Sequence, residues 1–386
     1  MSSRGLSLRS GLATAIGAAF LHACTPGVKQ YPAWDGGFGG ESTGSGTGGG
    51  ELMLDAGNGG PPPADAAGVC QNVTHKLIVD PPNVYFILDR SGSMSAPAAG
   101  GGTRYTAVQH AASTIVKSLQ LFIKAGAAVF PGNGNQCAAG QEVFPPTYAN
   151  PNGFDQATKQ VMPSGGTPTS ATLFSLASTL TALPGKTVVV LATDGGPNCN
   201  AAADCTIDEC MENIEGCSQQ DSCCALQQNC CAPGGPAGPL NCVDHQASVQ
   251  AVSALASAGI KVYVVGIPGS QAYQKVLADM ALAGGAAVPA WPFYYKVDDL
   301  STIASVLAAA AGSAIPCEFK LEDVPEDPTL TSVYFDKTLV KPDPKDGWTW
   351  TAPDAIALHG AACIKLQSGQ VGQVQIVSEC AGGTTQ

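Results

Sequence analysis

The chain has 386 residues, enough for two or three domains, and its 45% hydrophobic content is ample for a folded core. Only 12% of the residues are charged, the formal net charge is −12, and no basic run exceeds two residues. This argues against nucleic acid as a partner and against docking on an anionic membrane by charge, because both need clustered Lys and Arg. No apolar stretch reaches the roughly 20 residues of a membrane-spanning helix.

Residues 1–23 have the pattern of an export signal, in which two arginines precede a short apolar run. The run ends at Ala23-Cys24, a junction that resembles the lipobox of bacterial lipoproteins, where the cysteine carries the lipid. Ordinary cleavage after Ala23 is the alternative. The lipobox predicts lipidation of Cys24, attachment to a membrane through the lipid alone, and, because Thr25 follows, delivery to the bacterial outer membrane or cell surface.

A Gly- and Pro-rich segment follows the export signal, at residues 24–69. Residues 25–69 hold 14 Gly and 5 Pro, a composition typical of flexible chains. We expect a tether with a root-mean-square reach of roughly 35–40 Å, which lifts the following domain off the membrane.

Alternating strand and helix patterns begin after Cys70. Continuous apolar runs are typical of strands buried on both faces, and apolar residues three and four positions apart are typical of helices that pack on a sheet. Strands are predicted at 83–88, 126–130, 187–192, 260–266 and 294–297, and helices around 108–122, 173–183, 273–280 and 300–310. The pattern predicts an α/β domain at residues 70–316, with a doubly wound, mostly parallel sheet flanked by helices.

Residues 317–386 lack the helical period and contain short runs that are typical of strands. The segment from Val371 to Val377 alternates apolar residues with small or polar ones, as a half-buried strand does. We expect a small β-rich C-terminal domain here.

A cysteine-rich insertion at residues 199–242 interrupts the α/β pattern just after the strand at 187–192. Its nine cysteines are Cys199, Cys205, Cys210, Cys217, Cys223, Cys224, Cys230, Cys231 and Cys242. Nine is odd, so at least one bridge must leave the insertion, and Cys137 is the expected outside partner. Without Cys24 the chain has 14 cysteines, and we expect all of them to be oxidised in an exported protein. A zinc or iron–sulfur cluster is the alternative, and the lack of a regular Cys-x-x-Cys pair weighs against it.

Polar residues follow two of the predicted strands where each strand ends. The first strand runs into Asp89, Ser91 and Ser93, and the strand at 187–192 runs into Asp194. Between them, Thr167 follows a Gly pair at the start of a predicted helix. Open parallel sheets bind ligands at the carboxyl ends of their strands, so these side chains are expected to meet at one edge of the sheet.

These five residues resemble the metal-ion-dependent adhesion site of von Willebrand factor type A domains, whose pattern is Asp-x-Ser-x-Ser, a Thr and then an Asp. The resemblance covers about residues 82–314. It implies that Asp89, Ser91, Ser93, Thr167 and Asp194 hold Mg²⁺, with Ca²⁺ or Mn²⁺ as alternatives, because all are oxygen donors. It also implies a protein partner that offers an Asp or Glu side chain to the metal. The alternative is that these residues only cap helices and fill a turn.

The resemblance extends to one disulfide bond, because some members of the family join the two ends of the domain. It suggests Cys70–Cys317, with Cys363–Cys380 left for the C-terminal part. Sequence alone does not determine connectivity, so other pairings stay open.

Catalysis is not expected, because the histidines stand alone and no His-Glu-x-x-His motif occurs. We therefore expect a surface-anchored, metal-dependent adhesion or protein-interaction module rather than an enzyme. The alternative function is a structural lipoprotein of the cell envelope, whose metal site only stabilises the fold.

Overall fold

The computed structural model describes residues 72–78, 80–98, 101–216 and 227–379. The predicted export signal, Cys24, the tether and Cys70 lie outside these residues. Among the residues that it does describe, no helix combines the length and the apolar character needed to cross a membrane.

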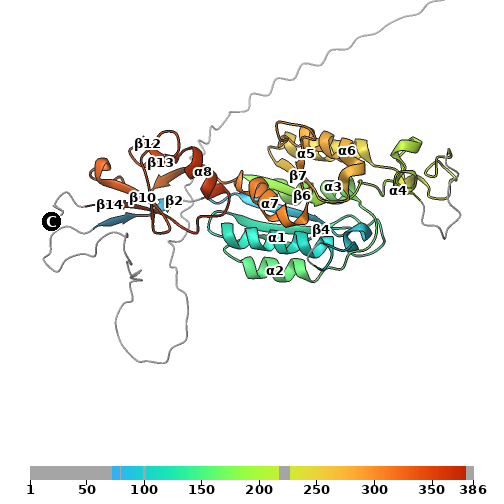
Figure 1. Ribbon diagram of the computed structural model, residues 1–386, viewed down its shortest axis with the longest axis horizontal. Helices are drawn as coiled ribbons and strands as arrows, with labels where there is room; N and C mark the ends of the chain where they lie inside the picture. The colour runs from blue at the N-terminus through green and yellow to red at the C-terminus, as the bar shows by residue number, and fades with distance from the viewer. Residues whose placement is uncertain (1–71, 79, 99–100, 217–226, 380–386) are drawn as a thin grey trace, which may run out of the picture. The chain divides into compact units, whose positions relative to one another are not determined.

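A six-stranded sheet forms the centre of the α/β part, in the order β5-β4-β3-β6-β7-β8 (Figure 1). All neighbouring strands in it are parallel except β4 and β5, which confirms the predicted mostly parallel sheet. The strands are β3 (Asn83–Asp89), β4 (Lys124–Phe130), β5 (Gln141–Tyr148), β6 (Thr187–Thr193), β7 (Lys261–Gly266) and β8 (Tyr295–Lys296).

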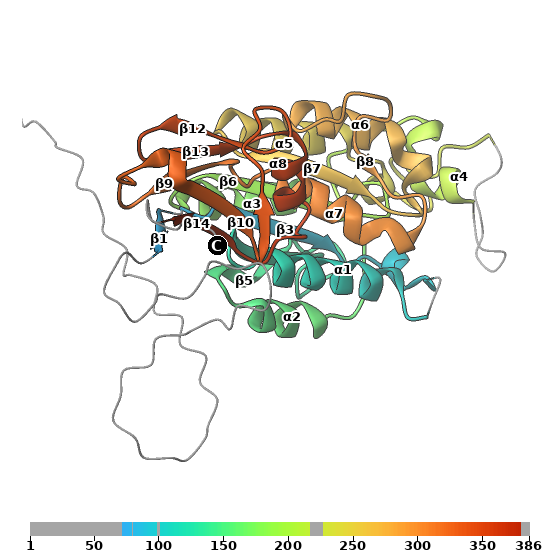
Figure 2. The same ribbon diagram turned by 60° about the vertical axis from the view of Figure 1, so that its left-hand side comes forward.

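Helices cover both faces of this sheet, as the two hydrophobic cores show (Figures 1 and 2). Every residue of β3 is buried, and its side chains alternate between the cores because successive residues of a strand point to opposite faces. Phe86 packs with α1, α2 and α7, whereas Ile87 packs with α3, α5 and α6. These helices are α1 (Arg104–Leu119), α2 (Pro151–Lys159), α3 (Thr169–Ala182), α5 (His245–Ser257), α6 (Gln274–Ala283) and α7 (Ile303–Gly312).

Two of these helices, α2 and α5, were not predicted from the sequence. Helix α5 is rich in Ala and Ser, and its buried face consists of Ser248, Ala251, Val252 and Leu255. These positions follow the helical period, but half of them are small or polar, so the apolar signal in the sequence is weak.

The remaining helices of the α/β part and its neighbours are short. Helix α4 spans Met211–Glu215, and 3₁₀ helices span Gly92–Ser95, Ile207–Glu209, Pro239–Asn241, Ser270–Tyr273, Leu300–Thr302 and Pro328–Leu330.

The β-rich part consists of two antiparallel sheets, with the orders β1-β14-β10-β11 and β12-β13-β9-β2. Their elements are β1 (Val73–His75), β2 (Leu77–Ile78), β9 (Glu318–Leu321), β10 (Thr331–Phe335), β11 (Thr338–Val340), β12 (Trp348–Ala352), β13 (Ala355–Leu358), α8 (Gly360–Gln367) and β14 (Val374–Ser378). Strands β1 and β2 precede the α/β part in the chain but pair with β14 and β9. Segments from both sides of the α/β part therefore build this region.

Hydrogen bonds join the β-rich part to the α/β part. The Gln367 side chain at the end of α8 donates to the Ile315 carbonyl (2.9 Å). Helix α8 also packs against α7.

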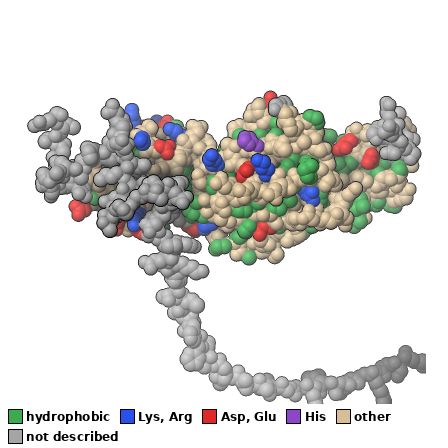
Figure 3. Space-filling model, turned by 90° about the horizontal axis from the view of Figure 1, so that it is seen from below, with side chains coloured by type: hydrophobic (Ala, Val, Ile, Leu, Met, Phe, Trp, Pro, Cys, Tyr) green, Lys and Arg blue, Asp and Glu red, His purple; other side chains and the backbone are tan. Residues whose placement is uncertain are grey.

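On the face shown in Figure 3, charged side chains are sparse and of both signs, in keeping with the low charge content of the sequence.

The disulfide expected between Cys70 and Cys317 is wrong, because Cys317 bonds to Cys363. Helix α8 brings Cys363 next to the start of β9, with 5.6 Å between the two Cα atoms. The Leu358 amide donates to the Cys317 carbonyl (2.7 Å) and fixes this approach. The expected Cys363–Cys380 pair is wrong for the same reason, and Cys70 and Cys380 lie outside the described residues.

Candidate metal centre

The first part of the centre is the loop after β3. The Asp89 carboxylate is fully buried. Its Oδ1 accepts a hydrogen bond from the Ser91 amide (2.7 Å), and its Oδ2 accepts one from the Thr193 hydroxyl (2.5 Å). Because Thr193 ends β6, the Asp89 carboxylate joins two adjacent strands at their carboxyl ends.

The second part is the end of β6, where Asp194 is 1% exposed. Its Oδ1 accepts a hydrogen bond from the Ser93 hydroxyl (2.7 Å), and its Oδ2 is paired with the Arg104 guanidinium (2.6 Å). The hydroxyls of Ser91 and Ser93 lie 3.0 Å apart. Ser93 therefore links the other serine of the first loop to the carboxylate of the second part.

Thr167, just before α3, completes the arrangement. Its amide donates to the Asn198 side chain (2.6 Å), and the Asn198 amide donates back to the Thr167 carbonyl (2.9 Å). A Cβ added to Gly195 would lie 3.7 Å from both the Ser93 and the Thr167 hydroxyl oxygens. Within the described part of the chain, no hydrogen bond uses the Thr167 hydroxyl. The structure thus brings all five sequence-predicted residues together.

Arg90 ties the loops of the centre to one another, a role that the sequence analysis missed. Its guanidinium donates to the carbonyls of Pro131 (2.6 Å), Gly132 (2.7 Å) and Met162 (3.0 Å). Its backbone carbonyl accepts from the Ser164 amide (2.7 Å). The only signal in the sequence is its place between the two motif residues Asp89 and Ser91.

Two acidic side chains and one arginine determine the charge of the centre. Burial, together with the neighbouring charge of Asp194, raises the pKa of Asp89 to about 7. Burial also raises the pKa of Asp194. Arg104 pairs with Asp194, so one net negative charge remains when both carboxylates are ionised. Two carboxylates and three hydroxyls are hard oxygen donors, and they fit a divalent cation such as Mg²⁺.

We expect the metal-free protein to lose stability as the pH rises from about 4 to about 7. In this range folded Asp89, with a pKa of about 7, holds a proton that the unfolded chain, with a pKa of 3.8, has released. The free energy of unfolding should therefore fall by up to about 1.4 kcal/mol per pH unit. Urea unfolding in chelator at a series of pH values measures this slope. Asp89→Asn should flatten it, and equal slopes in the two proteins would contradict the prediction.

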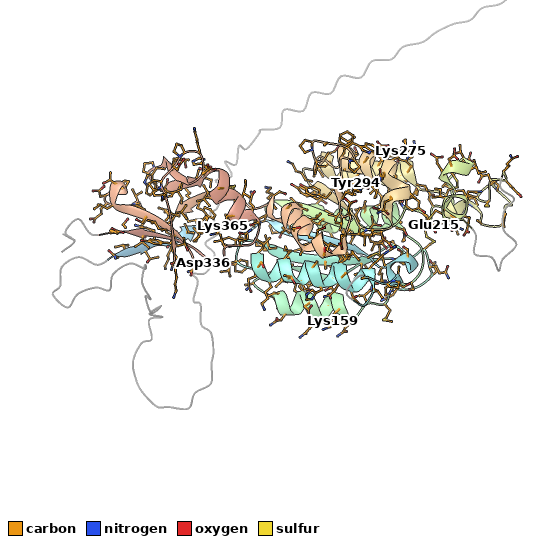
Figure 4. The ribbon with its side chains drawn as sticks, in the orientation of Figure 1. Lys159, Glu215, Lys275, Tyr294, Asp336 and Lys365 are labelled. Atoms are coloured by element: carbon orange, nitrogen blue, oxygen red, sulfur yellow. A yellow bond between two sulfur atoms is a disulfide. The ribbon has the colours of Figure 1, made fainter. Side chains whose placement is uncertain are left out.

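A pocket of about 600 Å³ opens at the centre. Residues around the five-residue centre that line it are Arg104, Gln136, Gly165, Gly166, Gly195, Asn198 and Gly269. The cysteine-rich insertion adds Met211 and Glu215 of α4 and Asn241. Figure 4 shows Glu215, whose carboxylate accepts a hydrogen bond from the Tyr273 hydroxyl (2.5 Å). The insertion therefore forms part of the pocket wall.

Disulfide bonds hold the insertion together and to the sheet. Cys137 bonds to Cys199, which is a bridge of the kind that the odd cysteine count requires. Inside the insertion, the described bonds are Cys205–Cys242 and Cys210–Cys231. Cys230 is disulfide-bonded as well, whereas Cys217, Cys223 and Cys224 lie outside the described residues.

Three sulfur atoms of the insertion, from Cys205, Cys231 and Cys242, lie within 4.8 Å of one another. Each of these atoms belongs to a disulfide bond. Zinc binds cysteine as the thiolate, so this group offers zinc no ligand in the oxidised protein.

Residues 84–197 match the family model of the von Willebrand factor type A domain. No curated protein matches the chain significantly. Among solved structures, the vWF domain of the type V pili tip protein Mfa5 from Porphyromonas gingivalis is 12% identical, with a TM-score of 0.43 over 61% of this chain and 95% of that one. The pilus adhesin SpaC from Lactobacillus rhamnosus GG is 15% identical, with a TM-score of 0.46 over 81% of this chain and 41% of that one.

The PilB minor pilin from Streptococcus sanguinis is 16% identical, with a TM-score of 0.39 over 58% of this chain and 59% of that one. The family match runs from β3 to the loop after β6, and so includes all five residues of the centre. Together with the helix-flanked, mostly parallel sheet, it supports a von Willebrand factor type A domain in this part of the chain.

Proposed function

We propose that this protein is a divalent-metal-dependent adhesion or protein-interaction module, which captures an acidic side chain of a partner protein. The observation that carries the proposal is the convergence of two buried strand-end carboxylates and three hydroxyls, all of which except Asp89 line an open pocket. Asp89, Ser91, Ser93, Thr167 and Asp194 would hold the cation, Mg²⁺ or alternatively Ca²⁺ or Mn²⁺.

The donor set favours an anionic ligand over a neutral one. Three of the five donors are neutral hydroxyls, and the Asp194 carboxylate already shares its charge with Arg104. A divalent cation held this way keeps part of its positive charge, which a partner's Asp or Glu carboxylate neutralises. The pocket of about 600 Å³ leaves room for a side chain and its neighbours.

The insertion belongs to the same proposed binding surface. Met211 and Asn241 line the pocket together with the loops of the sheet, so a segment of a partner that enters the pocket touches the insertion too. We place the module outside the cell, held to the outer membrane or cell surface by a lipid on Cys24. The 46 residues between the lipid and the domain, 24–69, would give it reach.

Retention on peptide-coated beads tests the function directly. One set of beads carries a glutamate-containing peptide and the matched set carries the same peptide with glutamine. We expect retention of the mature chain only on the glutamate beads and only in Mg²⁺, because glutamine lacks the charge and a chelator removes the cation. Equal retention on both beads, or retention that survives chelation, would contradict the proposal.

A structural role for the metal would give a different pattern in the same experiment. In that case Mg²⁺ would raise the melting temperature by mass action, but the beads would retain nothing. That result would favour the structural envelope lipoprotein over the interaction module.

A further inference from the structure

Arg104 is held against the centre by features of three separate segments. It is the first residue of α1, and Thr103 caps that helix: its hydroxyl accepts from the Thr106 amide (3.2 Å). The Arg104 amide donates to the Ala96 carbonyl (2.9 Å), which fixes the start of the helix beside the first metal loop. The guanidinium reaches Asp194 at the end of β6 at 2.6 Å.

The loop after β7 leaves space for this guanidinium. A Cβ added to Gly269 would lie 2.6 Å from the Arg104 Nη1 atom and 2.8 Å from the Asp194 carbonyl oxygen. Gly269 also has a φ of 119°, which side chains rarely adopt. A residue with a side chain at this position would displace the guanidinium, so the surroundings of Arg104 are built to admit it.

Arg104 contacts the Asp194 oxygen that does not face the serines. Asp194 Oδ2 pairs with the guanidinium, while Oδ1 accepts from Ser93. The Arg104 side chain is 25% exposed and also lines the pocket, so it faces both the carboxylate and any incoming ligand. Its positive charge therefore repels the metal cation and attracts an anionic ligand.

We propose that Arg104 weakens metal binding and strengthens capture of the partner's carboxylate, so that the centre holds its cation best when an acidic ligand is present. This inference rests on the proposed function. With Arg104, the two carboxylates and a divalent cation leave a net positive centre that attracts an anion. Without Arg104, the two carboxylates cancel the charge of the divalent cation, and that attraction is lost.

The test compares Arg104→Gln with Lys117→Gln in the mature full-length chain. Lys117 is exposed on the same helix, thirteen positions further along and so about 20 Å away. The control therefore makes the same charge change outside the pocket. Arg104→Lys, which keeps the charge, is a second variant that separates charge from shape.

Two readouts are needed: Mg²⁺ affinity by calorimetry without ligand, and retention on the glutamate beads at saturating Mg²⁺. For Arg104→Gln we expect Mg²⁺ to bind on the order of tenfold more tightly and the beads to be bound on the order of tenfold more weakly. Lys117→Gln should match the wild type in both, and Arg104→Lys should stay close to it.

Melting temperatures give a third readout that does not depend on the ligand. In chelator, Arg104→Gln should melt below the wild type, because Asp194 is left buried without its partner. Saturating Mg²⁺ should then raise its melting temperature more than that of the wild type. This pattern also shows that the variant is folded.

Two results would overturn the role of Arg104. If Arg104→Gln weakens Mg²⁺ binding, Arg104 only positions Asp194; if it leaves both affinities unchanged, the guanidinium is a surface contact. A wild-type protein that binds Mg²⁺ but ignores the glutamate beads would overturn the proposed function instead. In that case an unchanged Mg²⁺ affinity in Arg104→Gln would still reject this inference.

Discussion

Asp89→Asn should weaken Mg²⁺ binding at least about 100-fold, because it removes one of two carboxylates that compensate the cation. The substitution keeps the size of the side chain and an oxygen that can accept the hydrogen bond from the Ser91 amide. The Asp89 carboxylate is fully buried, so removing its charge also removes a desolvation cost in the metal-free protein. We therefore expect the variant to fold and, near neutral pH in chelator, to be more stable than the wild type.

Calorimetric titration with Mg²⁺ or Mn²⁺ measures this effect, with unfolding in chelator as the check on folding. Asp298→Asn is a matched control, because Asp298 is an exposed acid that pairs with Lys296 and does not line the pocket. Thr167→Ala should weaken binding less than Asp89→Asn does, since a water molecule can replace one neutral donor. Unchanged affinity in Asp89→Asn would reject the metal centre, and a variant that fails to fold would favour the structural hypothesis.

Removing the Cys137–Cys199 bridge, by changing both residues to Ser, should lower the free energy of unfolding by about 4 kcal/mol. The bridge closes a loop with a sequence separation of 62 residues, so its loss frees a large part of the unfolded chain. It also anchors a pocket wall, because the Gln136 carbonyl next to Cys137 accepts from the Gly166 amide (2.8 Å). Partner capture should therefore weaken along with stability.

The matched control is the double variant without the Cys317–Cys363 bridge. That loop has a sequence separation of 46 residues, so the expected loss of stability is again about 4 kcal/mol. Neither cysteine lines the pocket, and capture by the folded protein should stay at the wild-type level. Urea unfolding and bead retention measure the two effects. If both variants lose capture equally, the bridge at Cys137 has no specific role at the centre.

The sequence by itself determined the fold class and the five residues of the candidate centre. Both depend on local patterns: β3 and β6 contain continuous apolar runs, and Asp89 and Asp194 stand where these strands end. In parallel strands the carboxyl ends share one edge of the sheet, so residues that follow adjacent strands must meet there. The odd cysteine count likewise required a bridge out of the insertion.

Only the tertiary structure decided which distant segments come together. Arg104 lies ninety positions from Asp194, and nothing in its local pattern distinguishes it from a solvated helix residue. The pairing of β1 with β14 and the Cys317–Cys363 bond depend on how the chain returns after the α/β part. Short-range periodicity reports which face of an element is buried, but the partner on that face is set by packing over the whole fold.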